Sequence, residues 1–284
     1  MRIARRFVAG ERIADAIDAV RRINDLGMSA TIDFLGEDVR SASDAAAIRA
    51  EYLRLLDALA DAGSRSNVSV KLTALGLLVD RALCKEHLLS IAARCADTTA
   101  RALLDPFVRI DMEGSALTEA TLQLFEEVYA ERKNVGIVLQ AYLKRTPEDL
   151  ERAIALGARV RLCKGAYKEP PDIALGDMPA IRRAFMRLAE TLLVRGNYPA
   201  IATHDEGIQS GVKAFAAEHR IDRGRFEFQM LYGVRPDLQH KLAAEGYNVR
   251  VYVPYGTHWR QYFYRRIRER RENALLALRA VFGR

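Results

Sequence analysis

Three charged residues stand within runs of apolar and β-branched residues. Lys71 lies in NVSVKLTALG, Asp111 in FVRIDMEG and Arg161 in ARVRLCKGAY. Burying a charge in such a run costs free energy unless an opposite charge or a ligand compensates it. The pattern therefore predicts either an internal ion-pair network that only fills space, or a site for an anionic ligand in which Asp111 orients a cation or a ring nitrogen.

A second concentration of charge lies in YFYRRIRERREN, residues 262–273, where five of the seven residues from 265 to 271 are arginine. Three interpretations compete: a solvated helix face, a patch for nucleic acid or membrane, and a clamp for a small anion. On a helix, the adjacent Arg265 and Arg266 point about 100° apart, so both can reach one carboxylate from two sides. Glu269 is spaced to hold one of them.

The elements that must position these residues follow a regular alternation. Apolar runs predict eight strands, at 29–36, 67–76, 107–114, 135–142, 158–167, 199–205, 225–233 and 248–256. Helical patterns lie between them, at 44–62, 86–104, 117–132, 147–156, 179–196, 206–219 and 235–245. An amphipathic helix containing Ile13, Ile17, Val20 and Ile23 precedes the first strand. Strict alternation predicts a parallel sheet, and eight repeats predict a closed (β/α)8 barrel. The alternative is an open doubly wound sheet, but no GxGxxG follows any strand.

In a barrel of this kind the active site forms at the C-terminal ends of the strands. Each predicted strand brings polar or aromatic residues to that end, and these include Glu37, Lys71, Asp111, Gln140, Lys164, His204, Gln229 and Tyr252. Gly165, in CKGAY, would let the backbone approach a phosphate or a ring closely. Two cations within strands and a third just after one favour an anionic substrate, an anionic cofactor or both.

Composition limits the class of protein. The chain has 284 residues, half of them hydrophobic, with 44 basic and 37 acidic residues and a net charge of +7. No low-complexity linker divides it, which predicts a single domain, 1–284. Outside 262–271 both signs of charge are interspersed, which favours a basic enzyme over a nucleic-acid-binding protein.

The cysteines and the apolar runs predict the compartment. Cys84, Cys95 and Cys163 are far apart and match no disulfide or metal-ligand spacing, so no metal site is predicted. No apolar run approaches the roughly 20 residues of a membrane-spanning helix. The first residues combine arginines with acidic residues and lack the apolar core of a signal peptide. We therefore expect a cytoplasmic protein.

Taken together, the motifs resemble those of the proline dehydrogenases, specifically the short monofunctional bacterial type. The resemblance covers nearly the whole chain and is carried by RFVAGERIADAI, DFLGE, VSVKL, RIDME, VLQAY, RLCKGAY, ATHD, FEFQMLYG, VYVPYG and YRRIRE. It implies a distorted (β/α)8 barrel that binds FAD non-covalently, with the last helix over the barrel mouth. It also implies oxidation of L-proline to Δ1-pyrroline-5-carboxylate, with hydride transfer to FAD and reoxidation by a membrane quinone, as the first step of proline catabolism.

The resemblance further implies roles for individual residues. Asp111 and Arg161 match catalytically important positions, with Arg161 close to the flavin N5. Lys71, Arg265 and Arg266 would bind the proline carboxylate, and Leu231, Tyr252 and Tyr262 would line its ring. Glu37 matches a carboxylate that pairs with Arg265 and gates the site. The FAD contacts implied are Met112, Gln140, Arg161, Lys164, Gly165, Ala166, Tyr167, Thr203 and His204.

Two alternative functions remain open from the sequence, and the resemblance implies several binding partners. One alternative is a Schiff-base barrel enzyme, such as an aldolase, with Lys71 or Lys164 as the nucleophile. The other is a nucleic-acid-binding protein that uses the arginine run, although no exposed aromatic residues are interleaved with it. The expected partners are L-proline, a membrane quinone and, transiently, pyrroline-5-carboxylate dehydrogenase. The basic surface is expected to favour peripheral contact with anionic lipid at the inner face of the membrane.

Overall fold

The computed structural model describes residues 6–36, 38–98 and 105–259, and within them eight parallel strands form a closed barrel in chain order. The strands are β1 Ser29–Phe34, β2 Ser66–Val70, β3 Val108–Ile110, β4 Val135–Gln140, β5 Val160–Cys163, β6 Ala200–Ala202, β7 Glu227–Leu231 and β8 Asn248–Tyr255. Each strand pairs with the next, and β8 pairs with β1 in parallel register. The predicted barrel is confirmed.

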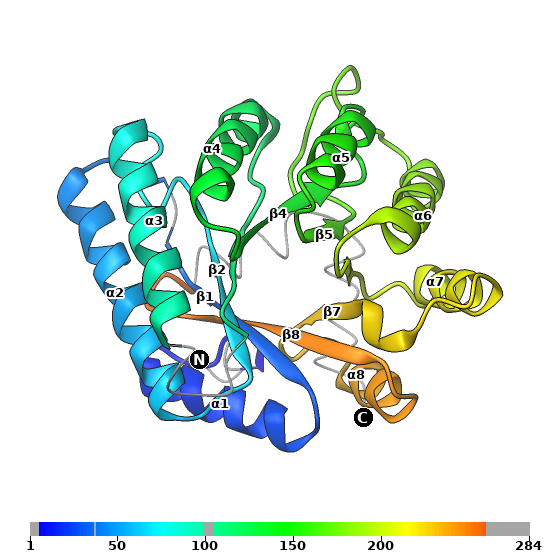
Figure 1. Cartoon of the computed structure of the whole chain (residues 1–284), viewed down its shortest axis with the longest axis horizontal. Coiled ribbons are helices and arrows are strands. Elements are labelled where there is room, and N and C mark those ends of the chain that lie inside the picture. Colours follow the sequence, from blue (N-terminus) through cyan, green and yellow to red (C-terminus); the bar gives the residue numbers. More distant parts are fainter. Residues whose placement is uncertain (1–5, 37, 99–104, 260–284) are drawn as a thin grey trace.

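Helices surround the strands (Figure 1). They are α2 Ala42–Asp61, α3 Arg81–Asp97, α4 Thr118–Glu131, α5 Thr146–Ala155, α6 Met178–Arg195, α7 Glu206–Glu218 and α8 Pro236–Ala244, with the 3-10 turns η3 Ser115–Leu117 and η4 Arg223–Arg225. The start predicted for α3, at residue 86, was wrong. The helix begins at Arg81 because the Asp80 side chain caps it, accepting a 3.0 Å hydrogen bond from Leu83 N.

The helix α1, Ile13–Asp25, precedes the first strand and packs against β1 and β8. Ile17, Val20 and Ile23 face the barrel and are buried, as their spacing predicted. In a regular (β/α)8 barrel, the helix that follows the last strand covers the first and last strands. Here α1 lies against β1 and β8, in the position that this helix usually occupies. The predicted helix after β8, and with it the prediction that this helix covers the barrel mouth, lies outside the described residues.

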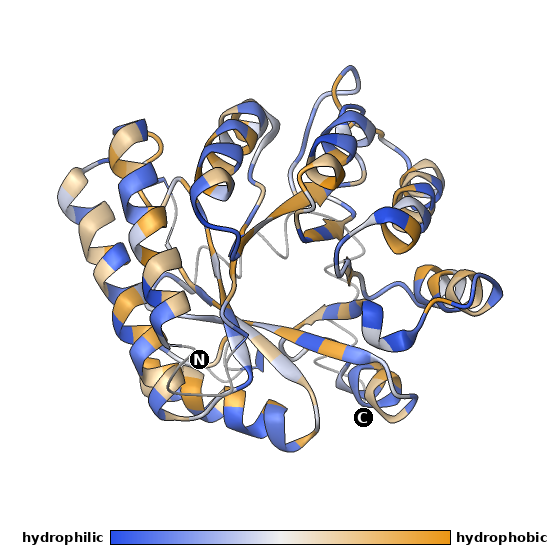
Figure 2. Cartoon of the chain, viewed as in Figure 1, coloured by the Kyte–Doolittle hydropathy of each residue, from blue (hydrophilic) through white to orange (hydrophobic). Residues whose placement is uncertain are grey.

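Side chains along the strands alternate between two environments. In β8, Val249, Val251 and Val253 belong to the hydrophobic core shared with the helices, whereas Arg250 and Tyr252 point into the barrel. Figure 2 shows the alternation along β8. The apolar core is thus a layer between strands and helices, and the barrel interior is polar.

The strands are shorter than the apolar runs predicted. β2 ends at Val70 and β3 at Ile110, so Lys71 and Asp111 directly follow their strands instead of lying within them. The chain turns at once after β2, where Leu75 N donates to Lys71 O at 3.2 Å. Of the three charges that define the predicted site, only Arg161 lies inside its strand, β5.

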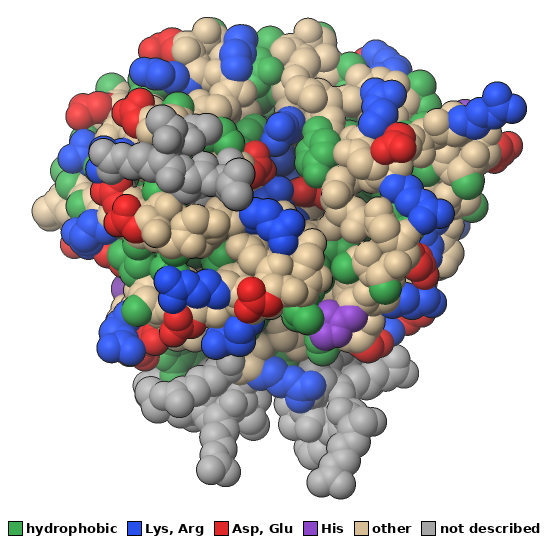
Figure 3. All heavy atoms as spheres, turned by 60° about the horizontal axis from the view of Figure 1, so that its bottom comes forward, with side chains coloured by type: hydrophobic (Ala, Val, Ile, Leu, Met, Phe, Trp, Pro, Cys, Tyr) green, Lys and Arg blue, Asp and Glu red, His purple; other side chains and the backbone are tan. Residues whose placement is uncertain are grey.

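The surface carries both signs of charge. On the face drawn in Figure 3, lysines and arginines alternate with aspartates and glutamates, and the described residues show no continuous basic patch there. Many exposed charges of the described residues are paired, as in the bidentate pair of Arg195 with Glu151. Across the described ranges, no helix is both long enough and apolar enough to span a bilayer.

Candidate active site

Four charged side chains form one ion-pair network at the C-terminal end of the barrel. Lys71 Nζ donates to the two carboxylate oxygens of Asp33, at 2.9 and 2.8 Å, and lies 3.9 Å from Asp111 Oδ2. Arg161 Nη1 donates to Asp111 Oδ1 at 2.7 Å. Asp33, Lys71 and Arg161 are buried. Because each charge has an opposite charge in contact, burial is compensated within the network.

Asp33 is the functional position that the sequence reasoning missed. It is completely buried and binds the Lys71 ammonium with two hydrogen bonds. A signal was present: Ile32–Asp33 and Ile110–Asp111 are the same dipeptide in similar places, near the C-terminal ends of β1 and β3, the two strands that pair with β2 on either side. The two carboxylates consequently flank Lys71 from neighbouring sides.

The state of Lys71 bears directly on the Schiff-base alternative. Burial lowers the pKa of Lys71, but the Asp33 and Asp111 carboxylates outweigh burial and raise its pKa above the usual value. A Schiff-base lysine needs a neutral amine, which requires a lowered pKa. Lys164, the second candidate nucleophile, is held in an ion pair with Asp205 at 2.7 Å. The aldolase-type alternative is therefore not supported.

Asp111 is held on both oxygens. Ser69 Oγ donates to Oδ1 at 2.8 Å and the Tyr252 hydroxyl donates to Oδ2 at 2.8 Å. Tyr252 also lies beside Arg161, with the guanidinium carbon 5.4 Å from the ring centroid. Asp111 therefore joins a lysine, an arginine and a tyrosine from three separate strands into one rigid group.

A cavity of about 540 Å³ opens beside this network, at the C-terminal ends of the strands. Every predicted site residue within the described ranges lines it: Lys71, Asp111, Met112, Gln140, Arg161, Lys164, Gly165, Ala166, Tyr167, Thr203, His204, Leu231 and Tyr252. Its volume is in the range of small-molecule and cofactor sites. The remaining predicted residues, Glu37, Tyr262, Arg265 and Arg266, lie outside the described residues.

One wall of the cavity is formed by the turn after β5. Gln140 bridges this turn to β3, donating from Nε2 to Glu113 O at 3.0 Å and accepting from Ala166 N at 3.2 Å. Gly165 has a φ of +120°, and a Cβ there would come within 2.1 Å of the Tyr142 ring. The structure thus shows a second reason for the glycine, and the close approach of a ligand at Gly165 stays a prediction. Backbone conformation and the Tyr142 ring require the glycine.

The rim of the cavity carries a second ionic group. Asp205, at the start of α7, accepts from Lys164 Nζ at 2.7 Å and from Arg182 Nε at 2.6 Å. Burial raises the pKa of Asp205, but these hydrogen bonds and charges outweigh it and lower the pKa to about 2. Arg182 was not predicted, because it lies within the helical pattern of α6, where an arginine usually indicates a solvated face. His204 Nε2 accepts from Leu231 N at 2.9 Å and links the loop after β6 to the end of β7.

One nitrogen of the Arg161 guanidinium makes no hydrogen bond to the described residues. Its Nε donates to Gln229 Oε1 at 2.5 Å, and its Nη1 donates to Asp111 and to Ser69 Oγ, the latter at 3.0 Å. Its Nη2 is buried and has no hydrogen-bond partner among the described residues. Because Arg161 lines the cavity, a ligand there can accept this hydrogen bond.

A closed (β/α)8 barrel with a charged, ligand-sized cavity at the C-terminal ends of its strands defines a barrel enzyme. Comparison with known proteins is consistent with that class and narrows it. The family model described as Proline dehydrogenase matches residues 16–276, and the chain belongs to this family. Membership defines it as an oxidoreductase of proline catabolism, as the resemblance predicted.

Individual relatives agree with the family. The chain is 43% identical to Proline dehydrogenase 1 of Bacillus subtilis subsp. natto over 98% of this chain and 90% of that protein. It is 40% identical to Proline dehydrogenase of Deinococcus radiodurans, with the same coverage. Among solved structures, proline utilization A from Bdellovibrio bacteriovorus, inactivated by N-propargylglycine, matches with a TM-score of 0.88 and 25% identity. That match covers 99% of this chain but only 34% of the other.

Proposed function

We propose that the cavity binds FAD together with L-proline, and that the chain oxidises proline there to Δ1-pyrroline-5-carboxylate. The observation that carries this proposal is that Arg161 lines the cavity and that its buried Nη2 has no hydrogen-bond partner among the described residues. Leaving a buried donor unsatisfied costs about 1–3 kcal/mol. A ligand with an acceptor atom at that point removes the cost. An oxidoreductase of this family needs a hydride acceptor. A flavin ring would serve as that acceptor, and it also carries oxygen and nitrogen atoms that can accept a hydrogen bond from Nη2.

The residues of the cavity would divide the work of holding FAD. When bound, FAD supplies the hydride acceptor for the reaction. Arg161 would donate from Nη2 and present a fixed positive charge, held in advance by Asp111. Gln140, Gly165 and Ala166 would form one wall, and Lys164 would bring a cation to the rim. Met112, Tyr167, Thr203 and His204 line the same cavity and are proposed as further contacts.

The substrate carboxylate requires more positive charge than the central network offers. Lys71 and Arg161 are matched by Asp33 and Asp111, so these four groups sum to zero. We therefore retain the proposal that Arg265 and Arg266 bind the carboxylate with Lys71. Leu231 and Tyr252, which line the cavity, would contact the pyrrolidine ring together with Tyr262. A pair of Glu37 with Arg265 would close the site over bound proline.

The electron acceptor and the protein partners rest on the resemblance. We propose that a membrane quinone reoxidises the flavin, and that the protein meets it by transient peripheral contact at the inner face of the membrane. Contact with pyrroline-5-carboxylate dehydrogenase is a further proposal. It is supported by the solved relative proline utilization A, in which the matching region is about a third of a longer chain.

The visible spectrum of the purified protein tests the proposal. We expect flavin absorption bands, and anaerobic addition of L-proline should bleach them. Incubation with proline and borohydride serves as the control for Schiff-base chemistry and should leave the mass of the protein unchanged. A protein that fails to bind added FAD, or whose flavin bands persist with proline, would contradict the proposed function.

A further inference from the structure

We propose that Gln229 is a positioning residue that aims the free Nη2 of Arg161 into the cavity. The inference rests on the proposed role of Arg161 towards the flavin, and it concerns a residue that also lines the cavity and holds Nε of Arg161. Gln229 lies in β7, two strands away from Arg161 in β5, and its side chain is buried. It is the point where the cavity-facing network meets a second charged network in the barrel floor.

The amide of Gln229 can have only one orientation. Its Oε1 accepts from Arg161 Nε at 2.5 Å, and its Nε2 donates to Glu227 Oε1. A guanidinium only donates and a carboxylate only accepts. Reversing the amide would therefore place N–H against N–H and oxygen against oxygen. The two charged neighbours fix the rotamer of Gln229 without help from packing.

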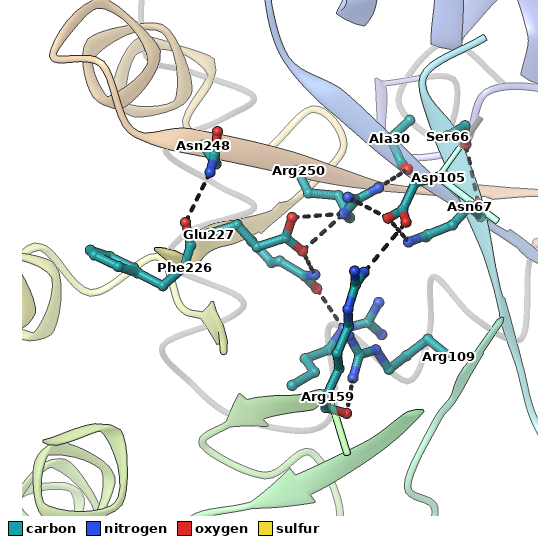
Figure 4. Close-up of polar contacts among 12 residues, drawn as sticks. Ala30, Ser66, Asn67, Asp105, Arg109, Arg159, Phe226, Glu227, Asn248 and Arg250 are labelled. Carbon is teal, nitrogen blue, oxygen red and sulfur yellow. Dashed lines mark hydrogen bonds and ion pairs between the residues drawn. The ribbon is translucent and has the colours of Figure 1, made fainter. Parts of the chain in front are cut away.

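The floor network holds Gln229 from below. Arg250 Nε donates to the Glu227 carboxylate at 2.9 and 3.1 Å. Arg250 Nη2 donates to Asp105 at 2.9 Å, and its Nη1 donates to Ala30 O at 2.8 Å. Figure 4 shows Arg250 between the two carboxylates. Both carboxylate oxygens of Glu227 are thereby held in place. The Gln229 amide, which donates to this carboxylate, is held in turn.

Fixing two nitrogens of a guanidinium fixes the third. The group is planar, with its donors in a rigid fork. Gln229 holds Nε of Arg161, while Asp111 and Ser69 hold Nη1. The direction of Nη2 then follows from geometry alone. Without Gln229 only Nη1 remains held, and the plane can rotate about that contact, so Nη2 no longer has one direction into the cavity.

A double-mutant cycle tests the inference. Gln229→Met keeps the length of the side chain but removes both polar atoms. We expect the rate of flavin reduction at saturating proline to fall about 10-fold to 100-fold, the cost of misplacing a catalytic group. KM for proline should change much less, and the flavin reduction potential should become more negative. In the Arg161→Met background, Gln229→Met should cause no further loss, because Gln229 acts through Arg161.

The control for a merely structural effect is Asn67→Ala. Asn67 is also a buried amide on the floor network, donating to Asp105 at 3.0 Å, but it makes no direct hydrogen bond to Arg161 or to Gln229. It should lower stability with little change in rate or potential. If Gln229→Met does not fold, Gln229→Asn takes its place, since it keeps an amide but withdraws the oxygen by one methylene.

The outcomes separate the two proposals. If the wild type binds FAD and Arg161→Met slows reduction, but Gln229→Met keeps the wild-type rate and potential, the inference about Gln229 is wrong and the proposed function stands. The same holds if the losses of Arg161→Met and Gln229→Met multiply in the double variant. A wild type without flavin, or an Arg161→Met variant with unaltered reduction, overturns the proposed function and this inference with it.

Discussion

Arg161 and Arg250 are two similarly buried arginines inside one barrel, and they differ in whether their Nη2 has a hydrogen-bond partner among the described residues. Their exposed fractions are 5% and 4%. Every nitrogen of Arg250 has a partner: Nε has Glu227, Nη1 has Ala30 O and Nη2 has Asp105. In Arg161 the corresponding Nη2 has none among the described residues. All nitrogens of the floor arginine, Arg250, are satisfied within the protein, whereas we propose that a ligand satisfies Nη2 of the mouth arginine, Arg161.

The comparison shows that burial and charge alone do not identify a binding residue. Both arginines compensate carboxylates. Burial raises the pKa of Glu227, but the Arg250 guanidinium outweighs burial and lowers it. The two arginines differ in whether every hydrogen-bond donor of the guanidinium has a partner within the described protein. Substitutions in the network whose donors are all satisfied should mainly lower the free energy of unfolding. Substitutions in the network with an unsatisfied donor should mainly lower the reaction rate.

The largest loss of stability is expected from a substitution in the barrel floor, at Arg250. Arg250→Met leaves the buried Glu227 without its main partner, and breaking such a pair costs about 3–5 kcal/mol of unfolding free energy. The partly exposed Asp105 keeps Arg159 and Asn67. The rate of flavin reduction in the folded fraction should fall far less than in Arg161→Met. Urea unfolding and stopped-flow reduction measure the two quantities. Arg195→Met is the matched control: it removes an exposed pair with Glu151 and should cost no more than about 1 kcal/mol. Equal losses in the two variants would refute the assignment of the floor.

The second effect is expected at the mouth. In Arg161→Met, Asp111 keeps hydrogen bonds from Ser69 and Tyr252, so the stability loss should be smaller than for Arg250→Met. Removing a preorganised donor from a reacting centre typically costs about 10²–10³ in rate. Single-turnover reduction of the flavin by proline measures this directly. A variant that unfolds more readily than Arg250→Met, yet reduces flavin at the normal rate, would erase the distinction between mouth and floor.

The sequence predicted the barrel because alternation of strands and helices is a local pattern, repeated along the chain. Strand ends were the weak point. The apolar run at 67–76 continues beyond β2 into a buried turn, so periodicity could not mark the end at Val70. The predicted site residues within the described ranges converge on one cavity, since a parallel barrel brings all C-terminal strand ends to one face.

The connections inside the barrel could not be predicted in the same way. Arg109 and Arg250 stand in apolar runs much like that of Arg161, and nothing local indicates which of the three has a free donor. The distinction arises from contacts between residues far apart in sequence, such as Gln229 with Arg161, 68 positions away. Asp33 was overlooked for a related reason, because its partner Lys71 follows a different strand.

A third effect tests whether the mouth network needs additional cations. Arg266→Ala should raise KM for proline by about 10-fold to 100-fold, equivalent to about 1.5–3 kcal/mol for a charge-assisted contact. FAD should remain bound, which the visible spectrum checks. Arg270→Ala, in the same arginine-rich segment, is the control for general loss of positive charge and should leave KM unchanged. An unaltered KM in Arg266→Ala would mean that the carboxylate is bound by Lys71 without this arginine.

The smallest effect concerns the rim of the cavity, where Asp205 pairs with two partly exposed cations. Asp205 contacts Lys164 and the half-exposed Arg182, and its side chain also caps α7 by accepting from Gly207 N at 3.1 Å. Asp205→Asn removes the charge but keeps a residue that caps well. Solvent screening limits the loss to about 1 kcal/mol at pH 7.

The pH dependence separates charge from geometry at this position. The pKa of Asp205 is about 2 in the folded protein, below the value of about 3.9 for an unfolded aspartate. Its stabilising contribution is therefore fully present above about pH 4 and is lost as the pH falls towards 2. The difference in unfolding free energy between wild type and Asp205→Asn should shrink between pH 5 and pH 3, as urea unfolding across this range would show. A difference that stays constant would assign the loss to the altered cap, since capping by a neutral amide does not titrate. The rim would then differ from the floor, because its role would be geometric and independent of charge.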